Sequence, residues 1–125
     1  MTEVYMRTKK GIPVYFDPNH EYTASILPNP TQIIVGPNFK TLSCDEQTFI
    51  IHHEEGHLIH GFTHLAPPEK MFEIEHNCDR HACENTSLKA ALGALDNMIE
   101  RNKRLNFSTD HLDQRRAELE KFYLK

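Results

Sequence analysis

Two histidines four residues apart, His53 and His57, bracket a pair of glutamates in the stretch HEEGH. On an α-helix, residues at this spacing lie on one face about one turn apart, so the two imidazoles can converge on one metal ion. Neutral imidazole is a good zinc ligand. Glu54 directly follows the first histidine, and its carboxylate would flank the ion, where it can take a proton from a zinc-bound water. The stretch therefore offers two metal ligands and a general base.

A catalytic zinc ion takes three protein ligands and leaves one position for water, so a third ligand is required. In one known arrangement a third histidine follows a glycine at a fixed offset, but Gly61 and His64 each stand one residue too late for it. In the other arrangement the third ligand is a glutamate on a second helix, and Glu75 lies eighteen residues after His57. Asp79 follows one turn later, where it can accept a hydrogen bond from the outer N–H of a ligand histidine. We therefore expect the second helix to supply both a ligand and its orienting partner.

The histidine pair is predicted to lie in the C-terminal half of a helix over residues 44–60. Ser43 with Glu46 three residues later is a capping box, which marks a helix N-terminus, and Gly61 is a plausible end. An apolar series supports the same helix, consisting of Phe49, Ile50, Leu58 and Ile59.

Three further helices are predicted after this one. Pro67 and Pro68 favour the start of a helix over residues 69–84, since proline is preferred in a first turn. Thr86 or Ser87 can cap a third helix, and Ser108 can cap a fourth over residues 109–123. The third helix carries a core-facing stripe of Leu88, Leu92, Leu95 and Ile99, and the fourth a thinner apolar face of Leu112, Leu119 and Phe122.

Short runs of β-forming residues precede the helices. Residues 4–7 and 12–16 flank Lys9-Lys10-Gly11 and indicate a hairpin, and residues 24–27 and 33–35 are separated by the break Pro28-Asn29-Pro30. We predict an α+β fold: a small antiparallel-containing sheet packs on the zinc-binding active-site helix, followed by the glutamate-ligand helix and C-terminal helices. Residues 1–125 would form a single metallopeptidase-like domain.

Composition narrows the class of protein further. A chain of 125 residues, 38% hydrophobic and 26% charged, suits one globular domain, and its net charge of −4 gives no electrostatic reason to expect nucleic-acid binding. No apolar run reaches the roughly eighteen residues of a membrane span, and the first seven residues lack a signal-peptide core. Three cysteines suit reduced thiols better than a disulfide framework. We expect a cytoplasmic protein whose oligomeric state stays open.

The two motifs together resemble those of the gluzincin metallopeptidases, in the clan of the CAAX prenyl protease, the HtpX heat-shock protease and the small soluble minigluzincins. The second motif of that family is E-x-x-A-D-R-x-A, and residues 75–82 read EHNCDRHA, departing only at Cys78. The resemblance covers roughly residues 33–83. The transmembrane helices and longer inter-motif insert of the membrane-embedded relatives are absent. A more distant resemblance, to short metallopeptidases that cleave phage and stress repressors, shares the first motif, but those usually have Asn in place of Asp79.

The resemblance implies a zinc metalloendopeptidase that hydrolyses peptide bonds in a peptide or protein substrate. Zn²⁺ would be bound by His53, His57 and Glu75. Glu54 would activate the metal-bound water and act as general base and acid, and Asp79 would orient a ligand histidine.

The family also implies two features that this sequence does not place. A sheet edge above the metal would hold the substrate backbone by strand addition, and either residues 33–35 or a strand of the first hairpin is a candidate. The alternative is that all of these segments are core strands. A donor would stabilise the oxyanion, and the candidates are Arg80, His81, His111 and Tyr123.

Other histidines and cysteines are predicted to have structural or surface roles. Cys78, His81 and Cys83 fall on different faces of one helix, and His52 points about 100° away from its neighbour His53. The alternative function is a catalytically latent or inactive zinc-binding module with a regulatory or interaction role, in which a terminal segment fills the cleft. The intact Glu54 favours the enzyme, because a base has little purpose beside a purely structural ion.

Overall fold

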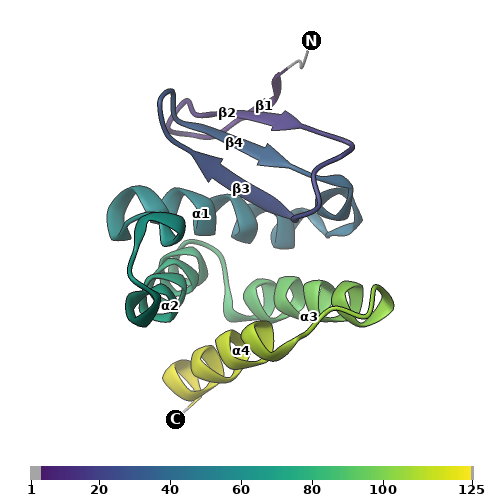
Figure 1. The fold of residues 1–125 in the computed structure, drawn as a ribbon, viewed down its shortest axis with the longest axis vertical. Helices are drawn as coiled ribbons and strands as arrows, with labels where there is room; N and C mark the ends of the chain where they lie inside the picture. Colours follow the sequence, from purple (N-terminus) through teal and green to yellow (C-terminus); the bar gives the residue numbers. More distant parts are fainter. Residues whose placement is uncertain (1–3, 125) are drawn as a thin grey trace.

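The computed structural model describes residues 4–124 and has an α+β architecture, which confirms the predicted fold class (Figure 1). A small mixed sheet lies on one side of helix α1 (Cys44–His60), and three further helices lie on the other side. Residues 1–3 and residue 125 lie outside the described part. The first three of the seven residues predicted to lack a signal-peptide core therefore fall outside it.

The sheet contains strands β1 (Val4–Arg7), β2 (Pro13–Phe16), β3 (Ala24–Leu27) and β4 (Gln32–Val35), in the order β1-β2-β4-β3. β1 and β2 form the predicted antiparallel hairpin, β3 and β4 are also antiparallel, and β2 and β4 are parallel. β4 is therefore an interior strand, and the suggestion that residues 33–35 form an exposed edge is wrong. The edge strand on the side of the helices is β3, which contacts α1.

Helix α1 begins and ends at the predicted residues because both ends carry the expected signals. The Ser43 side chain accepts a hydrogen bond from the Glu46 backbone N–H, and the Glu46 carboxylate accepts one from the Ser43 N–H. Such a cap stabilises a helix by about 1 kcal/mol. At the other end, Gly61 has a φ of 104°, a conformation that favours glycine, and its N–H donates to the His57 carbonyl.

Helix α1 is a central helix and not a simple amphipathic one. It contacts β3, α2 (Pro68–Asn85) and α3 (Leu88–Arg104). Phe49 and Ile50 are buried as expected, but Leu58 and Ile59 are 41% and 57% exposed. Since successive helical residues point about 100° apart, turning His57 inward directs these two side chains toward solvent.

The later helices lie close to the predicted ranges, but Phe122, predicted for the apolar face of the fourth helix, is 38% exposed, while Leu112 and Leu119 are buried. α3 is capped by Ser87, whose side chain accepts from the Ala90 N–H at 3.0 Å. α4 (Asp110–Tyr123) starts one residue later than predicted, with Thr109 at the N-cap, because Ser108 instead accepts from the Asp110 N–H in the preceding turn. Two short 3₁₀ turns, η1 (Pro37–Thr41) and η2 (Thr63–Leu65), flank α1.

The hydrophobic core is shared between the sheet and the helices, with fully buried side chains from each: Ile33, Phe39, Phe49, Leu95 and Leu119. In the span 4–124, none of the helices combines the length and the apolar composition that crossing a membrane requires.

Helices α1 and α2 approach closely at Gly56. A Cβ atom placed on Gly56 would lie 3.1 Å from the Cα of Cys78 and 3.3 Å from its Sγ, tighter than nine in ten real Cβ contacts. A glycine here therefore allows the two backbones to approach, which brings the motif of α2 within reach of the α1 histidines.

Candidate metal centre

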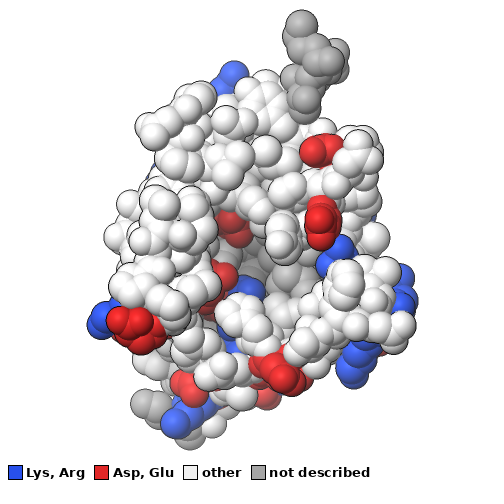
Figure 2. Space-filling view, viewed as in Figure 1, with Lys and Arg blue, Asp and Glu red and all other residues white. Residues whose placement is uncertain are grey.

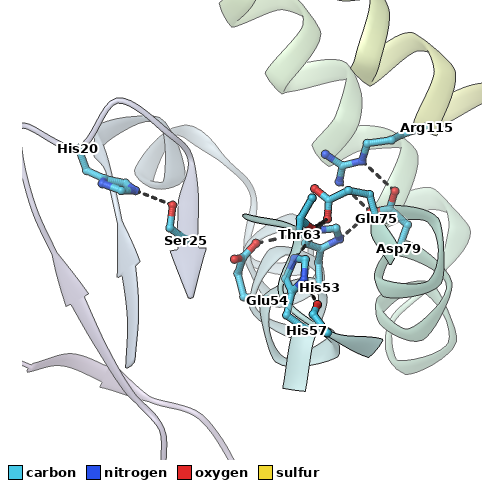
Figure 3. A network of polar contacts seen from close by, with 10 residues as sticks. His20, Ser25, His53, Glu54, His57, Thr63, Glu75, Asp79 and Arg115 are labelled. Atoms are coloured by element: carbon cyan, nitrogen blue, oxygen red, sulfur yellow. Dashed lines mark hydrogen bonds and ion pairs between the residues drawn. The ribbon is translucent and has the colours of Figure 1, made fainter. Parts of the chain in front are cut away.

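The three predicted ligands meet where α1 and α2 approach each other (Figure 3). His53 Nε2 lies 3.3 Å and His57 Nε2 3.2 Å from the same atom, Oε2 of Glu75. Their potential ligand atoms all lie within 4.8 Å of one another, and the two imidazole rings are 5.2 Å apart at 82°. The sequence prediction thus identified three side chains that the fold brings together.

The outer nitrogen of each imidazole already faces an oxygen acceptor. His53 Nδ1 lies 2.7 Å from Asp79 Oδ1, and His57 Nδ1 lies 2.8 Å from the Gly61 carbonyl oxygen. Both are acceptor oxygens, so they favour the proton on Nδ1 of each ring. In a neutral ring the Nε2 lone pair then points toward Glu75. Three lone-pair donors that face one another in this way fit a shared cation.

The proton affinities of the three side chains are linked through their mutual contacts. Burial disfavours a charge on His53, but Asp79 and Glu75 outweigh it and raise the pKa of His53 to about 10. Burial similarly disfavours a charge on Glu75, yet its contacts with His53 and His57 hold its pKa well below the usual range. The pKa of His57 is raised as well, because its contact with Glu75 outweighs burial. A metal ion would therefore displace protons from this centre as it binds.

Asp79 is anchored by an arginine from α4. Its side chain has no solvent exposure, and Arg115 donates to it twice, from Nε to Oδ2 at 2.9 Å and from Nη2 to Oδ1 at 2.8 Å. Burial alone would raise the pKa of Asp79, but Arg115 and His53 lower it to about 2. Asp79 is therefore ionised at neutral pH and bridges the guanidinium to a predicted ligand.

Arg115 was not singled out from the sequence, although one signal was present. Leu112, Arg115 and Leu119 are spaced to share one face of α4, and all three are buried. An arginine within an apolar stripe requires a buried anion as its partner. The sequence does not show which of the acidic residues that partner is.

The turn after α1 adds a further contact to the centre. The Thr63 hydroxyl donates to Glu75 Oε2 at 3.3 Å, so it helps to fix the carboxylate. His64 follows it, lining the neighbouring cleft without joining the three ligand atoms.

A cleft of about 550 Å³ opens beside the ligands, between β3, α1, α2 and the α3–α4 side of the molecule. Figure 2 shows this face hollowed, with acidic and basic side chains visible inside. Glu54 lines the cleft, with its Oε2 3.9 Å from His53 Nε2. Burial raises the pKa of Glu54, which strengthens it as a proton acceptor. Glu54 is thus a carboxylate at the cleft wall beside a predicted ligand.

Strand β3 forms part of the cleft wall through residues 24–26. It pairs with β4 on one side and with no other strand in the described chain, so one row of its backbone groups is unpaired by the sheet. Residues 24–26 therefore place an edge of the sheet along the cleft wall.

Of the four residues considered as oxyanion donors, His111 lines the cleft. Burial and the nearby Arg115 lower the pKa of His111, so its ring is neutral at neutral pH. The other three contact side chains outside the cleft: Arg80 lies over Phe122, His81 beside His52, and Tyr123 donates to Glu84.

Comparison of the chain with protein families, curated proteins and solved structures finds no match. We therefore infer the role of the centre from its own residues.

Proposed function

We propose that the chain is a zinc-dependent endopeptidase that hydrolyses peptide or protein substrates. The observation that carries this proposal is the convergence of His53, His57 and Glu75 beside a cleft that also holds Glu54. Two imidazoles and one carboxylate are a ligand set of catalytic zinc sites, which leave a fourth position open. The carboxylate of Glu54 is not part of the ligand cluster and so is free to move protons.

A zinc ion bound to these three ligands would act as a Lewis acid toward water and toward the scissile carbonyl. Glu54 would accept the proton of the attacking water on its carboxylate and later deliver it to the leaving amine. Asp79 holds His53 through Nδ1, and Arg115 holds Asp79. His111 would donate an N–H to the oxygen on which negative charge develops.

The cleft supports a peptide as the substrate. Its volume is in the range of small-molecule and peptide sites, and β3 offers unpaired backbone groups along one wall. Strand addition recognises the main chain more than particular side chains. We also propose a cytoplasmic location, supported by the free thiols of all three cysteines.

The test is the substitution Glu54→Gln, which preserves size and removes the base. We expect zinc affinity at the His53–His57–Glu75 centre to stay within a few-fold of wild type, while cleavage of a mixed peptide library falls at least about 100-fold. Glu73→Gln is the matched control, because Glu73 is 65% exposed and pairs with Lys70 on the surface of α2.

Two outcomes would decide against the enzyme. Unchanged cleavage by the Glu54→Gln variant would contradict the proposed role of Glu54 as general base. A zinc-loaded wild-type protein that cleaves no peptide in the library would favour the inactive zinc-binding module instead. Removing α4 is not expected to release latent activity, because α4 supplies Arg115 to the centre.

A further inference from the structure

Three side chains that could bind a metal lie near one another outside the cleft: His52 of α1 lies beside Glu55 of the same helix and beside His81 of α2. Successive residues of a helix are rotated by about 100°, so around the axis of α1 Gly56 lies between the two cleft histidines on one side and His52 and Glu55 on the other. This His52–Glu55–His81 cluster is therefore separated from the candidate metal centre by the close contact between the helices.

One oxygen of the Glu55 carboxylate is buried without a hydrogen-bond partner among the described residues. The Glu55 side chain is 5% exposed, and the oxygen without a partner is Oε2. Its Oε1 lies 3.7 Å from His52 Nδ1, too far for a good hydrogen bond. An ionised carboxylate buried in this way is unfavourable unless a cation or donor accompanies it.

Among the described residues, the ligand atoms of this cluster do not all lie within 4.8 Å of one another, so sharing an ion requires the side chains to move. The rings of His52 and His81 are 6.2 Å apart at 66°, about 1 Å wider than the 5.2 Å between the rings of His53 and His57. The side chain of His52 is 24% exposed and that of His81 is also partly exposed, so side-chain rotation has room to close this gap.

We propose that His52, Glu55 and His81 form a second metal site, which takes a divalent transition-metal ion such as Zn²⁺. Imidazole and carboxylate ligands suit this class of ion, and water would complete the coordination on the exposed side. Burial together with His52, Lys10 and His60 lowers the pKa of His81, so its ring is unprotonated and available to a metal at neutral pH. The bound ion would neutralise Glu55 and link α1 to α2 on the side away from the cleft.

The test counts zinc equivalents on the metal-free chain of residues 1–125, by calorimetric titration with Zn²⁺ and by equilibrium dialysis. Wild type should bind two equivalents, the second more weakly. His81→Ala and, independently, His52→Ala should each lose the second equivalent, or weaken it at least tenfold, and keep the first. His57→Ala should weaken the first and keep the second. His20→Ala, which removes a histidine bonded to Ser25 in the sheet region, should keep both.

The outcomes separate this site from the proposed function. A single equivalent that is lost in His57→Ala would overturn the second site and leave the first intact. Two unchanged equivalents in both His81→Ala and His52→Ala, or loss of the second in His20→Ala, would also overturn it. One equivalent that survives in His57→Ala but not in His81→Ala would support the second site and count against the first. Imidazole ¹⁵N spectra give a direct readout, since the second equivalent should shift the signals of His52 and His81.

Discussion

Arg115 neutralises a carboxylate that has no access to water. Its two hydrogen bonds also fix the plane of the Asp79 carboxylate, and with it the direction from which Oδ1 approaches His53. Removing one member of a buried ion pair leaves an uncompensated charge, which is typically destabilising by about 3–5 kcal/mol. A side chain that does not reach the ligand cluster thus controls the orientation of one of its members.

Arg115→Met should lower the free energy of unfolding by about 3–5 kcal/mol and weaken zinc binding about 10- to 100-fold. Arg116→Met is a matched control, because Arg116 pairs with Asp96 and Glu120 on the surface and exposed pairs contribute about 1 kcal/mol or less. Chemical denaturation and zinc titration of both variants measure these effects. Equal losses in the two variants would contradict a specific role for the contact with Asp79.

The ionisation of Asp79 should make the metal-free protein sensitive to acid. Its pKa is about 2 in the folded protein against an ordinary value of 3.8, so the charged form stabilises the fold above about pH 4. That contribution, about 2–3 kcal/mol, is lost as the pH falls toward 2. Urea unfolding of metal-free wild type and Asp79→Asn should therefore show a stability difference that shrinks between pH 5 and pH 2. A difference that stays constant over this range would rule out the assigned pKa.

Between elements, two glycines permit close contacts of different kinds. At Gly56 the neighbouring atoms include the backbone of α2 at Cys78, which can yield only if the helix moves. At Gly93 of α3 the neighbour is the end of the Glu46 side chain, which can rotate away. The first contact therefore sets the spacing of the helices that carry the predicted ligands, and the second affects the cap of α1.

Gly56→Ala should weaken zinc binding about tenfold or more, because α2 must shift and carry Glu75 with it. The loss of stability should be small, since alanine gains about 1 kcal/mol of helix propensity that offsets part of the strain. Gly93→Ala should leave zinc affinity unchanged and affect stability by about 1 kcal/mol through the cap. Zinc titration and thermal melting of the pair check both statements, and an unaltered zinc affinity in Gly56→Ala would contradict the first.

Over the whole molecule, the predicted ligands and their supports come from α1, α2, η2 and α4, so metal binding should be coupled to global stability. Free zinc at about 100 times the dissociation constant of the first centre should stabilise the fold by about 2.7 kcal/mol. For a chain of this size, that corresponds to a rise of about 10 °C in the melting temperature. Scanning calorimetry with zinc, and again after adding a chelator, measures the rise and its reversal. His57→Ala should lose most of the effect, and an equal rise in that variant would place the stabilising ion elsewhere.

Local signals predicted the parts of this fold that depend on near neighbours. The spacing of His53 and His57 and the Ser43–Glu46 box act within a few residues, and the bounds of α1 followed from them. Whether β4 is an edge or an interior strand depends on which strands pair with it. The burial of Ile33 and Val35 is compatible with either place in the sheet, so the apolar pattern does not decide between them. Contacts between distant segments, including that of α4 with Asp79, are not specified by such patterns.

The contact between Asp79 and Arg115 joins residues 36 positions apart. During synthesis, the carboxylate is therefore made well before the arginine that pairs with it. Both histidines, Glu75 and Asp79 leave the ribosome before Arg115 does. Until α4 emerges and docks, the carboxylate of Asp79 has no guanidinium to pair with, and burying it would carry a large desolvation penalty. The nascent chain therefore carries all three predicted ligands without the support that orients them, and tight metal capture should follow translation of α4.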